Sequence, residues 1–126
     1  MKEFDRLFGE HANWWQRLQT AIDMALEHSI YIVLKNDYTI TITPDGKLFF
    51  NSSSNAAMAS GGMGDVLTGV IAALLAQKYS PEDACIIGNY IHGKAGDELA
   101  LPNRMHVVLP GRLITQLPVT IAKLMA

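Results

Sequence analysis

The chain has 126 residues, of which 49% are hydrophobic and 17% are charged, a composition that excludes intrinsic disorder and suits one compact domain. The formal net charge of −2, without a lysine or arginine cluster, argues against a nucleic-acid or anionic-membrane surface and favours a small-molecule partner. Cys85 is the only cysteine, so no internal disulfide can form, and we expect a cytoplasmic protein without a membrane span.

The first half of the chain predicts a helix, a strand and a hairpin. Residues 10–28 carry apolar side chains at helical spacing. Residues 30–34 are almost all apolar and β-branched or aromatic, which is typical of a strand covered on both faces in a parallel sheet. Residues 38–43 alternate, 44–46 form a Pro-Asp-Gly turn, and 47–50 return, which predicts a β-hairpin.

The second half predicts helices. Residues 66–75 are apolar and helical in pattern, and Ser80 followed by proline and two acids predicts another helix start. That helix is expected to close at Pro102. The last helix, over residues 112–125, is expected to break or kink at Pro118. Together the elements predict a three-layer α/β fold, in which helices flank a mostly parallel sheet with a β-hairpin near its edge.

Residues 55–69, with the sequence NAAMASGGMGDVLTG, are the most informative stretch. Gly61, Gly62 and Gly64 can adopt angles forbidden to other residues and let a ligand approach the main chain closely. The free N–H groups of the following helix are expected to point back into this glycine loop, which is the usual construction of a phosphate site. Asp65 is unusual beside an anion, and it suggests a base placed next to a transferable phosphoryl group.

A purely structural role of this stretch is the alternative. Aspartate often caps a helix, and glycines before a helix often only make a tight turn. Three glycines in four positions, small residues on both sides and Thr68-Gly69 one turn into the helix exceed what a cap requires. The stretch is not a Walker A loop, because no Gly-Lys-Ser/Thr follows, and no strand leads straight into it as in a dinucleotide fingerprint.

The stretch and its surroundings resemble the C-terminal part of the ADP/ATP-dependent NAD(P)H-hydrate dehydratases, members of the ribokinase-like superfamily. Asp65 aligns with their catalytic acid, and Gly64 with a glycine that contacts the nucleotide. The residues that follow the predicted strand resemble their Lys-Gly-x-x-Thr nucleotide-binding segment: Lys35, Asn36, Asp37, Tyr38 and Thr39. Residues 90–97 resemble their helix with a His-Gly-x-Ala-Gly-Asp pattern, and residues 3–9 resemble the piece that follows their Thr-Pro-His.

The chain departs from the family pattern in three places. Met63 stands where the family usually has Thr or Ser, and Asn36 stands where it usually has Gly. The chain begins just where Thr-Pro-His would precede Lys2, so we expect a fragment that lacks the upstream half of the domain. An unpaired sheet edge in such a fragment favours association between copies, and we expect a homo-oligomer.

The resemblance implies that residues 1–126 form the C-terminal part of a ribokinase-like three-layer α/β/α domain. It implies ADP- or ATP-dependent dehydration of hydrated NADH or NADPH, with Mg²⁺ on the nucleotide phosphates and no metal ligands from the protein. Asp65 would be the catalytic base and would contact the substrate together with Asn55. The nucleotide-binding residues would be Lys35, Asn36, Asp37, Tyr38, Thr39, Gly61, Gly62 and Gly64.

Two alternatives stay open at this point. One is a small-molecule kinase of the same superfamily that acts on a sugar or a vitamin precursor. The other is a non-catalytic nucleotide-binding fragment, or a subunit that needs a partner to complete its fold.

Overall fold

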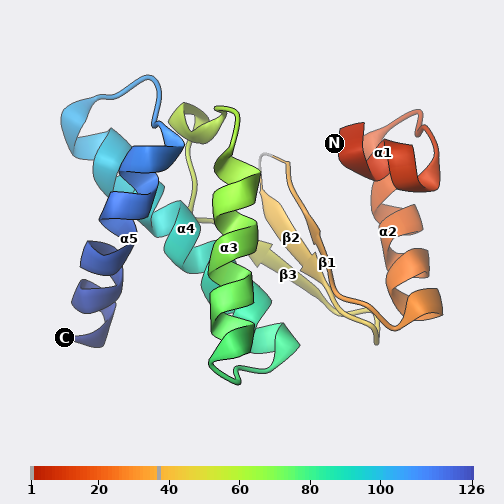
Figure 1. Cartoon of the computed structure of the whole chain (residues 1–126). Helices are drawn as coiled ribbons and strands as arrows, with labels where there is room; N and C mark the ends of the chain where they lie inside the picture. Colours follow the sequence, from red (N-terminus) through yellow and green to blue (C-terminus); the bar gives the residue numbers. More distant parts are fainter. Residues whose placement is uncertain (1, 37) are drawn as a thin grey trace. The chain divides into compact units, whose positions relative to one another are not determined.

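The computed structural model describes residues 2–36 and 38–126 and divides the chain into two compact units, Met1–Phe50 and Asn51–Ala126. Asp37, one of the predicted nucleotide-binding residues, lies outside the described residues. In chain order the elements are α1 (Lys2–Phe8), α2 (Trp14–His28), β1 (Ile32–Leu34), β2 (Thr39–Ile42), β3 (Leu48–Asn51), a short 3₁₀ helix η1 (Ala56–Met58), α3 (Met63–Ala76), α4 (Pro81–Asn103) and α5 (Pro110–Met125) (Figure 1).

Helix α2 and the strands enclose the core of the first unit. The helix begins at Trp14 rather than Glu10, because the side chain of Asn13 accepts a hydrogen bond of 2.9 Å from the Gln16 N–H and caps it. It ends at His28 and is followed by Ser29, which has a left-handed φ of 53°. The buried members of this core are Phe4, Leu18, Ala21, Ala25, Leu34, Ile40 and Ile42.

The sheet has the order β1-β2-β3, and β1 runs antiparallel to β2, with Leu34 opposite Ile40. The predicted hairpin is confirmed between β2 and β3, where the Thr43 N–H donates to the Lys47 carbonyl at 3.0 Å. The expected mostly parallel arrangement is wrong for the described strands. A parallel pair needs a crossover of about a dozen residues or more, whereas only residues 35–38 separate β1 from β2.

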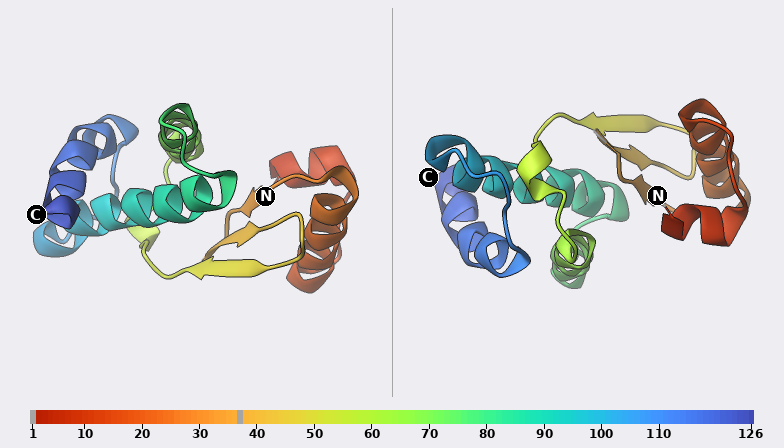
Figure 2. Two further views of the ribbon diagram at one scale, coloured as in Figure 1. Left: turned by 90° about the horizontal axis from the view of Figure 1, so that it is seen from below. Right: turned by 90° about the horizontal axis from the view of Figure 1, so that it is seen from above.

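Three helices make up most of the second unit. Helix α4 runs crosswise to α3, and α5 lies against the C-terminal part of α4 (Figure 2). The Ser80 side chain accepts a hydrogen bond from the Asp83 N–H, which confirms the predicted start of α4. The buried members of this core are Ala57, Met58, Met63, Ala95, Ala100, Val108 and Leu113.

The two internal prolines differ in their effect. Helix α4 ends at Asn103, one residue after Pro102 and close to the expected end. Helix α5 continues past Pro118, so the expected break there is wrong, while the expected kink stays a prediction. Pro118 is exposed, and the helix is held on both sides of it by Leu113 and Thr120, which are completely buried. Tertiary packing therefore keeps α5 continuous.

Of the helices in the described part of the chain, none combines the length and the hydropathy needed to cross a bilayer.

Candidate functional site

The glycine loop lies in the second unit and ends at Gly62, the residue that precedes α3. Gly62 has a φ of 92°, in the left-handed region, and its carbonyl accepts the Val66 N–H at 3.1 Å. A Cβ atom at this position would lie 3.0 Å from Cγ of Pro110. Both the left-handed backbone angle and the close contact with Pro110 therefore favour glycine at position 62. A Cβ atom at Gly61 would meet no neighbouring atom within 4 Å, so the loop is open on that side.

The N-terminus of α3 carries no side-chain cap. By contrast, Asn13 caps α2, Asn55 caps η1 and Ser80 caps α4. No side chain among the described residues caps the first-turn N–H groups of residues 63–65. These groups and the helix dipole form a positive end that can receive an anion.

Asp65 lies in the first turn of α3 and is exposed to solvent. Because Gly62 occupies the cap position and Asp65 is three residues further on, a capping role for this aspartate is wrong. In the described part of the chain its carboxylate has no hydrogen-bond or ion-pair partner from the protein. The geometry thus places an accessible carboxylate beside main-chain donors that no side chain caps, while its catalytic role stays a prediction.

Both polar atoms of the Asn55 side-chain amide form hydrogen bonds within the protein. Its Oδ1 accepts the Ala57 N–H at 3.0 Å, and its Nδ2 donates to Oδ1 of Asp97 at 2.7 Å. It therefore fixes the turn that leads into the glycine loop. The predicted contact of Asn55 with a substrate stays a prediction.

Two further contacts of the loop had no counterpart in the sequence analysis. Oγ of Ser60 donates to the Val108 carbonyl at 2.7 Å, and the Val108 N–H donates to the Ala57 carbonyl at 2.8 Å. Val108 is completely buried. These partners are almost fifty residues apart in the chain, and no periodicity or local motif connects such distant positions.

Helix α4 contacts the same loop from a different direction. Nε2 of His92 lies 3.0 Å from the Met63 carbonyl oxygen, and a Cβ atom at Gly93 would overlap the main chain of Ser53. A Cβ atom at Gly96 would overlap the side chain of Met58. This motif was identifiable in the sequence by resemblance only, and in the structure it contacts the loop and the chain that leads into it.

The remaining predicted nucleotide-binding residues lie in the first unit. Lys35 and Asn36 follow β1 and are exposed, Tyr38 is exposed, and Thr39 is the first residue of β2. They form one continuous segment between two strands. The three glycines and Asp65 belong to the other unit.

Outside the glycine loop, the described side chains form neither a metal site nor an activated cysteine. Among them no group of three histidine, cysteine, aspartate or glutamate residues is arranged to hold a metal ion. Burial raises the pKa of the Cys85 thiol, which disfavours the reactive thiolate form.

Residues 1–119 match the model of the carbohydrate-kinase-type family described as NAD(P)H-hydrate dehydratase. The chain is 39% identical over 124 residues to the bifunctional NAD(P)H-hydrate repair enzyme Nnr of Moorella thermoacetica, covering 97% of this chain and 23% of that protein. It is 34% identical over 118 residues to the ADP-dependent (S)-NAD(P)H-hydrate dehydratase of Bacillus subtilis, covering 92% and 43%.

Solved structures agree with these matches. The ADP/ATP-dependent NAD(P)H-hydrate dehydratase of Bacillus subtilis, co-crystallised with ATP and Mg²⁺, superposes with a TM-score of 0.84 at 33% identity, covering 97% of this chain and 45% of that one. A ribokinase-like superfamily protein of Enterococcus faecalis gives 0.75 at 33% identity, covering 97% and 42%. The predicted ribokinase-like class is therefore confirmed.

The chain spans less than half the length of these relatives. Within that span the match runs through both compact units and includes the glycine loop, Asp65 and the α4 motif. The chain belongs to the NAD(P)H-hydrate dehydratase family.

Proposed function

We propose that this chain is part of an enzyme that dehydrates hydrated NADH or NADPH with ADP or ATP as the phosphoryl donor. We also propose that residues 1–126 belong to one ribokinase-like domain. The observation that carries the proposal is the uncapped, glycine-lined N-terminus of α3 with the exposed Asp65 in its first turn, found in a chain of this family.

In this proposal the main chain of the glycine loop binds the transferring phosphoryl group. The amides of Gly61 and Gly62 in the loop, the amide of Gly64 in the first turn of α3 and the positive end of that helix stabilise the negative charge that spreads over its oxygens. The segment Lys35–Thr39 binds the nucleotide, with the Lys35 ammonium directed at its phosphates, as the family resemblance suggests. The open side of Gly61 supports close approach of a ligand to the main chain.

Asp65 is the proposed base. It accepts the proton of the ring hydroxyl of the hydrated nicotinamide as that oxygen takes the terminal phosphoryl group of the nucleotide. Phosphate then leaves the ring with its bonding electron pair, and loss of a proton from the neighbouring ring carbon restores the double bond of the reduced nicotinamide. The exposed carboxylate, which no described residue engages, is suited to this role, and Asn55 supports the substrate side of the loop.

Mg²⁺, when bound with the nucleotide, would neutralise charge on its phosphates. The described residues fit that arrangement, because the uncapped N-terminus of α3 is suited to the anionic phosphates that Mg²⁺ accompanies.

The test is recovery of the absorbance of reduced nicotinamide from hydrated NADPH or NADH with ADP or ATP. We would measure it for this chain and for a protein extended to the length of its relatives. The proposal expects recovery in the extended protein. Binding of ADP by the extended protein without any recovery would reject the dehydratase assignment, and consumption of ATP with a sugar or vitamin precursor would favour a kinase.

We further propose a cytoplasmic homo-oligomer that binds neither nucleic acid nor membranes. The lone Cys85 supports a reducing cytoplasmic setting, and the net charge of −2 supports the absence of a nucleic-acid or anionic-membrane partner. The outer strands β1 and β3 and exposed apolar side chains such as Leu101 and Met125 support self-association. Sedimentation of a monomer at high concentration would contradict it.

A further inference from the structure

We infer that His92 is a positioning residue of the candidate site, which fixes the first turn of α3 through the Met63 carbonyl and so aims the main-chain donors of the glycine loop. The inference rests on the proposed function only for the identity of the ligand, a nucleotide phosphate, that those donors bind. The distance of 3.0 Å between Nε2 of His92 and the Met63 oxygen is its central observation.

One face of α4 carries the segment that leads into the loop. The Asn89 carbonyl accepts a hydrogen bond of 3.1 Å from Nδ2 of Asn51, and the Tyr90 carbonyl accepts one of 3.1 Å from Oγ of Ser53. Further along α4, Asp97 accepts from Asn55. The α4 positions 89, 93, 96 and 97 recur at helical spacing, so they share one face.

Gly93 and Gly96 let the chain lie directly on the backbone of α4. At Gly93 a side chain would overlap both the carbonyl and the hydroxyl of Ser53, and at Gly96 it would overlap Met58. Both glycines are buried within the helix. Helix α4 thus sets the path of the chain before the loop. His92, next to Gly93, contacts the chain after the loop, at the first residue of α3.

The hydrogen bond of His92 has a defined direction. A carbonyl oxygen can only accept, so Nε2 of His92 carries the hydrogen and donates it. Met63 is the first residue of α3, and its peptide carbonyl shares the first turn with the N–H groups of residues 63–65, which no side chain caps. A donor on that carbonyl therefore restrains the rotation of the turn and the direction of its N–H groups.

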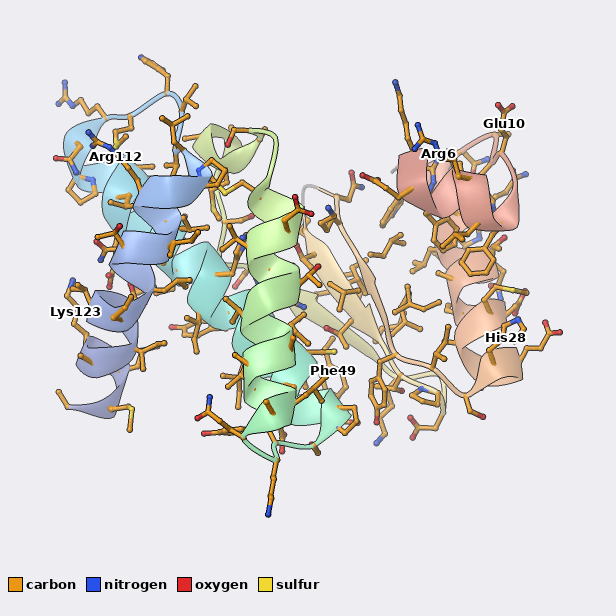
Figure 3. All side chains as sticks on the ribbon, viewed as in Figure 1. Arg6, Glu10, His28, Phe49, Arg112 and Lys123 are labelled. Carbon is orange, nitrogen blue, oxygen red and sulfur yellow. The ribbon has the colours of Figure 1, made fainter. Side chains whose placement is uncertain are left out.

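The competing explanation is that His92 only fills space between α3 and α4. Two substitutions separate the explanations. His92→Gln places an amide N–H near the position of Nε2 and keeps a donor, whereas His92→Leu keeps bulk and removes the donor. His28→Leu is the matched control, because His28 is an exposed histidine at the end of α2 in the other unit (Figure 3).

The readout is amide hydrogen exchange in the protein without nucleotide, at Val66, whose N–H donates to Gly62, and at Leu67 in the next position. We expect His92→Leu to speed exchange at both by about tenfold, since a hydrogen bond contributes on that order, with an unchanged global unfolding transition. His92→Gln and His28→Leu should stay close to the parent protein. Equal effects of the Gln and Leu variants, or no effect of either, would overturn the inference.

A second measurement ties the positioning role to the site. If the parent protein binds ADP, His92→Leu should weaken its affinity by about tenfold and His92→Gln should restore it. If the parent chain binds no ADP, the affinity is measured in a protein extended to the length of its relatives. If that protein binds none either, the proposed function fails, while the exchange result still decides the role of His92. Should the Leu variant not fold, His92→Asn replaces it, because the shorter amide falls short of the Met63 carbonyl and must show the faster exchange.

Discussion

Nδ2 of Asn55 donates a hydrogen bond of 2.7 Å to Oδ1 of Asp97, which joins the turn before the glycine loop to α4. Oδ1 of the same amide group accepts a hydrogen bond from the Ala57 N–H and caps η1. The amide is therefore held from two sides, and its donor can face only an acceptor. This directionality makes the pair testable by exchange of the two side chains.

Asn55→Asp alone should destabilise the second unit, because two carboxylates would face each other where an amide now donates. The cost is expected to be about 1–3 kcal/mol, that of a lost bond to a charged group. Asp97→Asn added to it should recover most of the loss, since the exchanged pair again places one amide donor opposite one carboxylate. The free energies of unfolding of the two single variants and the double variant give the coupling. Additive effects would show that the two residues do not interact.

Gly93→Ala should be strongly destabilising because the added methyl group would overlap Ser53. We expect a loss of at least about 1–3 kcal/mol in the free energy of unfolding, the usual cost of overpacking. Gly69→Ala is the matched control on α3, where a Cβ atom meets nothing within 4 Å. It should stabilise the protein by about 0.5–1 kcal/mol, since alanine has the higher helix propensity. Denaturant unfolding followed by circular dichroism measures both.

Glu98 links α4 to α5 and should make the second unit sensitive to acid. Its Oε2 accepts from Oγ1 of Thr120 at 2.8 Å, from Nε2 of Gln116 at 2.9 Å and from Nζ of Lys123 at 3.2 Å (Figure 3 labels Lys123). The Thr120 hydroxyl is the main cause that lowers the pKa of Glu98 below its ordinary value of 4.5. A carboxyl group whose pKa is lower in the folded protein than in the unfolded chain stabilises the fold at pH values above its ordinary pKa. This stabilisation is lost as the pH falls through the pKa of the folded state.

We therefore expect the difference in melting temperature between the parent protein and Glu98→Gln to shrink as the pH falls from about 7 to about 3. Thr120→Val, which removes the main hydroxyl donor from a completely buried position, should reduce the same pH dependence. Lys123→Gln should change it little, because this lysine is 59% exposed and surface ion pairs contribute about 0–1 kcal/mol. A constant difference across the pH range would contradict the role of Glu98.

Asp5 is the corresponding carboxylate of the first unit. Nε and Nη2 of Arg17 donate to its two oxygens at 3.0 and 2.8 Å, and Nδ1 of His11 lies 3.0 Å from Oδ1. The hydrogen bond from Arg17 is the main cause that lowers the pKa of Asp5 from 3.8 to about 2. The stability it provides is present above 3.8 and is lost as the pH falls toward 2.

A carbon-detected pH titration should place the Asp5 midpoint at about 2, and Arg17→Gln should move it upward. Asp5→Asn should lower the melting temperature at neutral pH by more than Asp23→Asn does. Asp23 is the control because it is exposed and bonded only to Gln19 among the described residues. A midpoint of Asp5 near its ordinary value would contradict the role of the Arg17 pair.

The parts of the fold that the sequence predicts correctly are those in which local chemistry decides. The start of α4 follows from Ser80 and Pro81, the hairpin from residues 44–46, and the open loop before α3 from its glycines. The prediction of a parallel direction for β1 was wrong. An apolar run carries no information on strand direction, whereas the short connection to β2 does.

The support of the candidate site was not predictable from local patterns. His92 looks like an ordinary packed histidine in the sequence, and its acceptor lies 29 residues away in the chain. Ser60 and Val108 are even further apart. Such contacts are set by how α3, α4 and the chain before α5 pack together, and a single sequence contains no periodicity that reports this packing.

Asp65→Asn is the most direct test of the proposed chemistry. In a protein extended to the length of its relatives, we expect turnover to fall by about 10²-fold or more, the typical contribution of a general base. Affinity for ADP should change little, because the main-chain donors of the loop remain and the base acts mainly in the transition state. Turnover is measured by the absorbance of reduced nicotinamide and affinity by calorimetry. Asp83→Asn, in the first turn of α4 and exposed, is the matched control and should leave both unchanged. If Asp65→Asn weakened ADP binding as strongly as it slowed turnover, the carboxylate would be a structural or binding group, and the anion site at α3 would need another base.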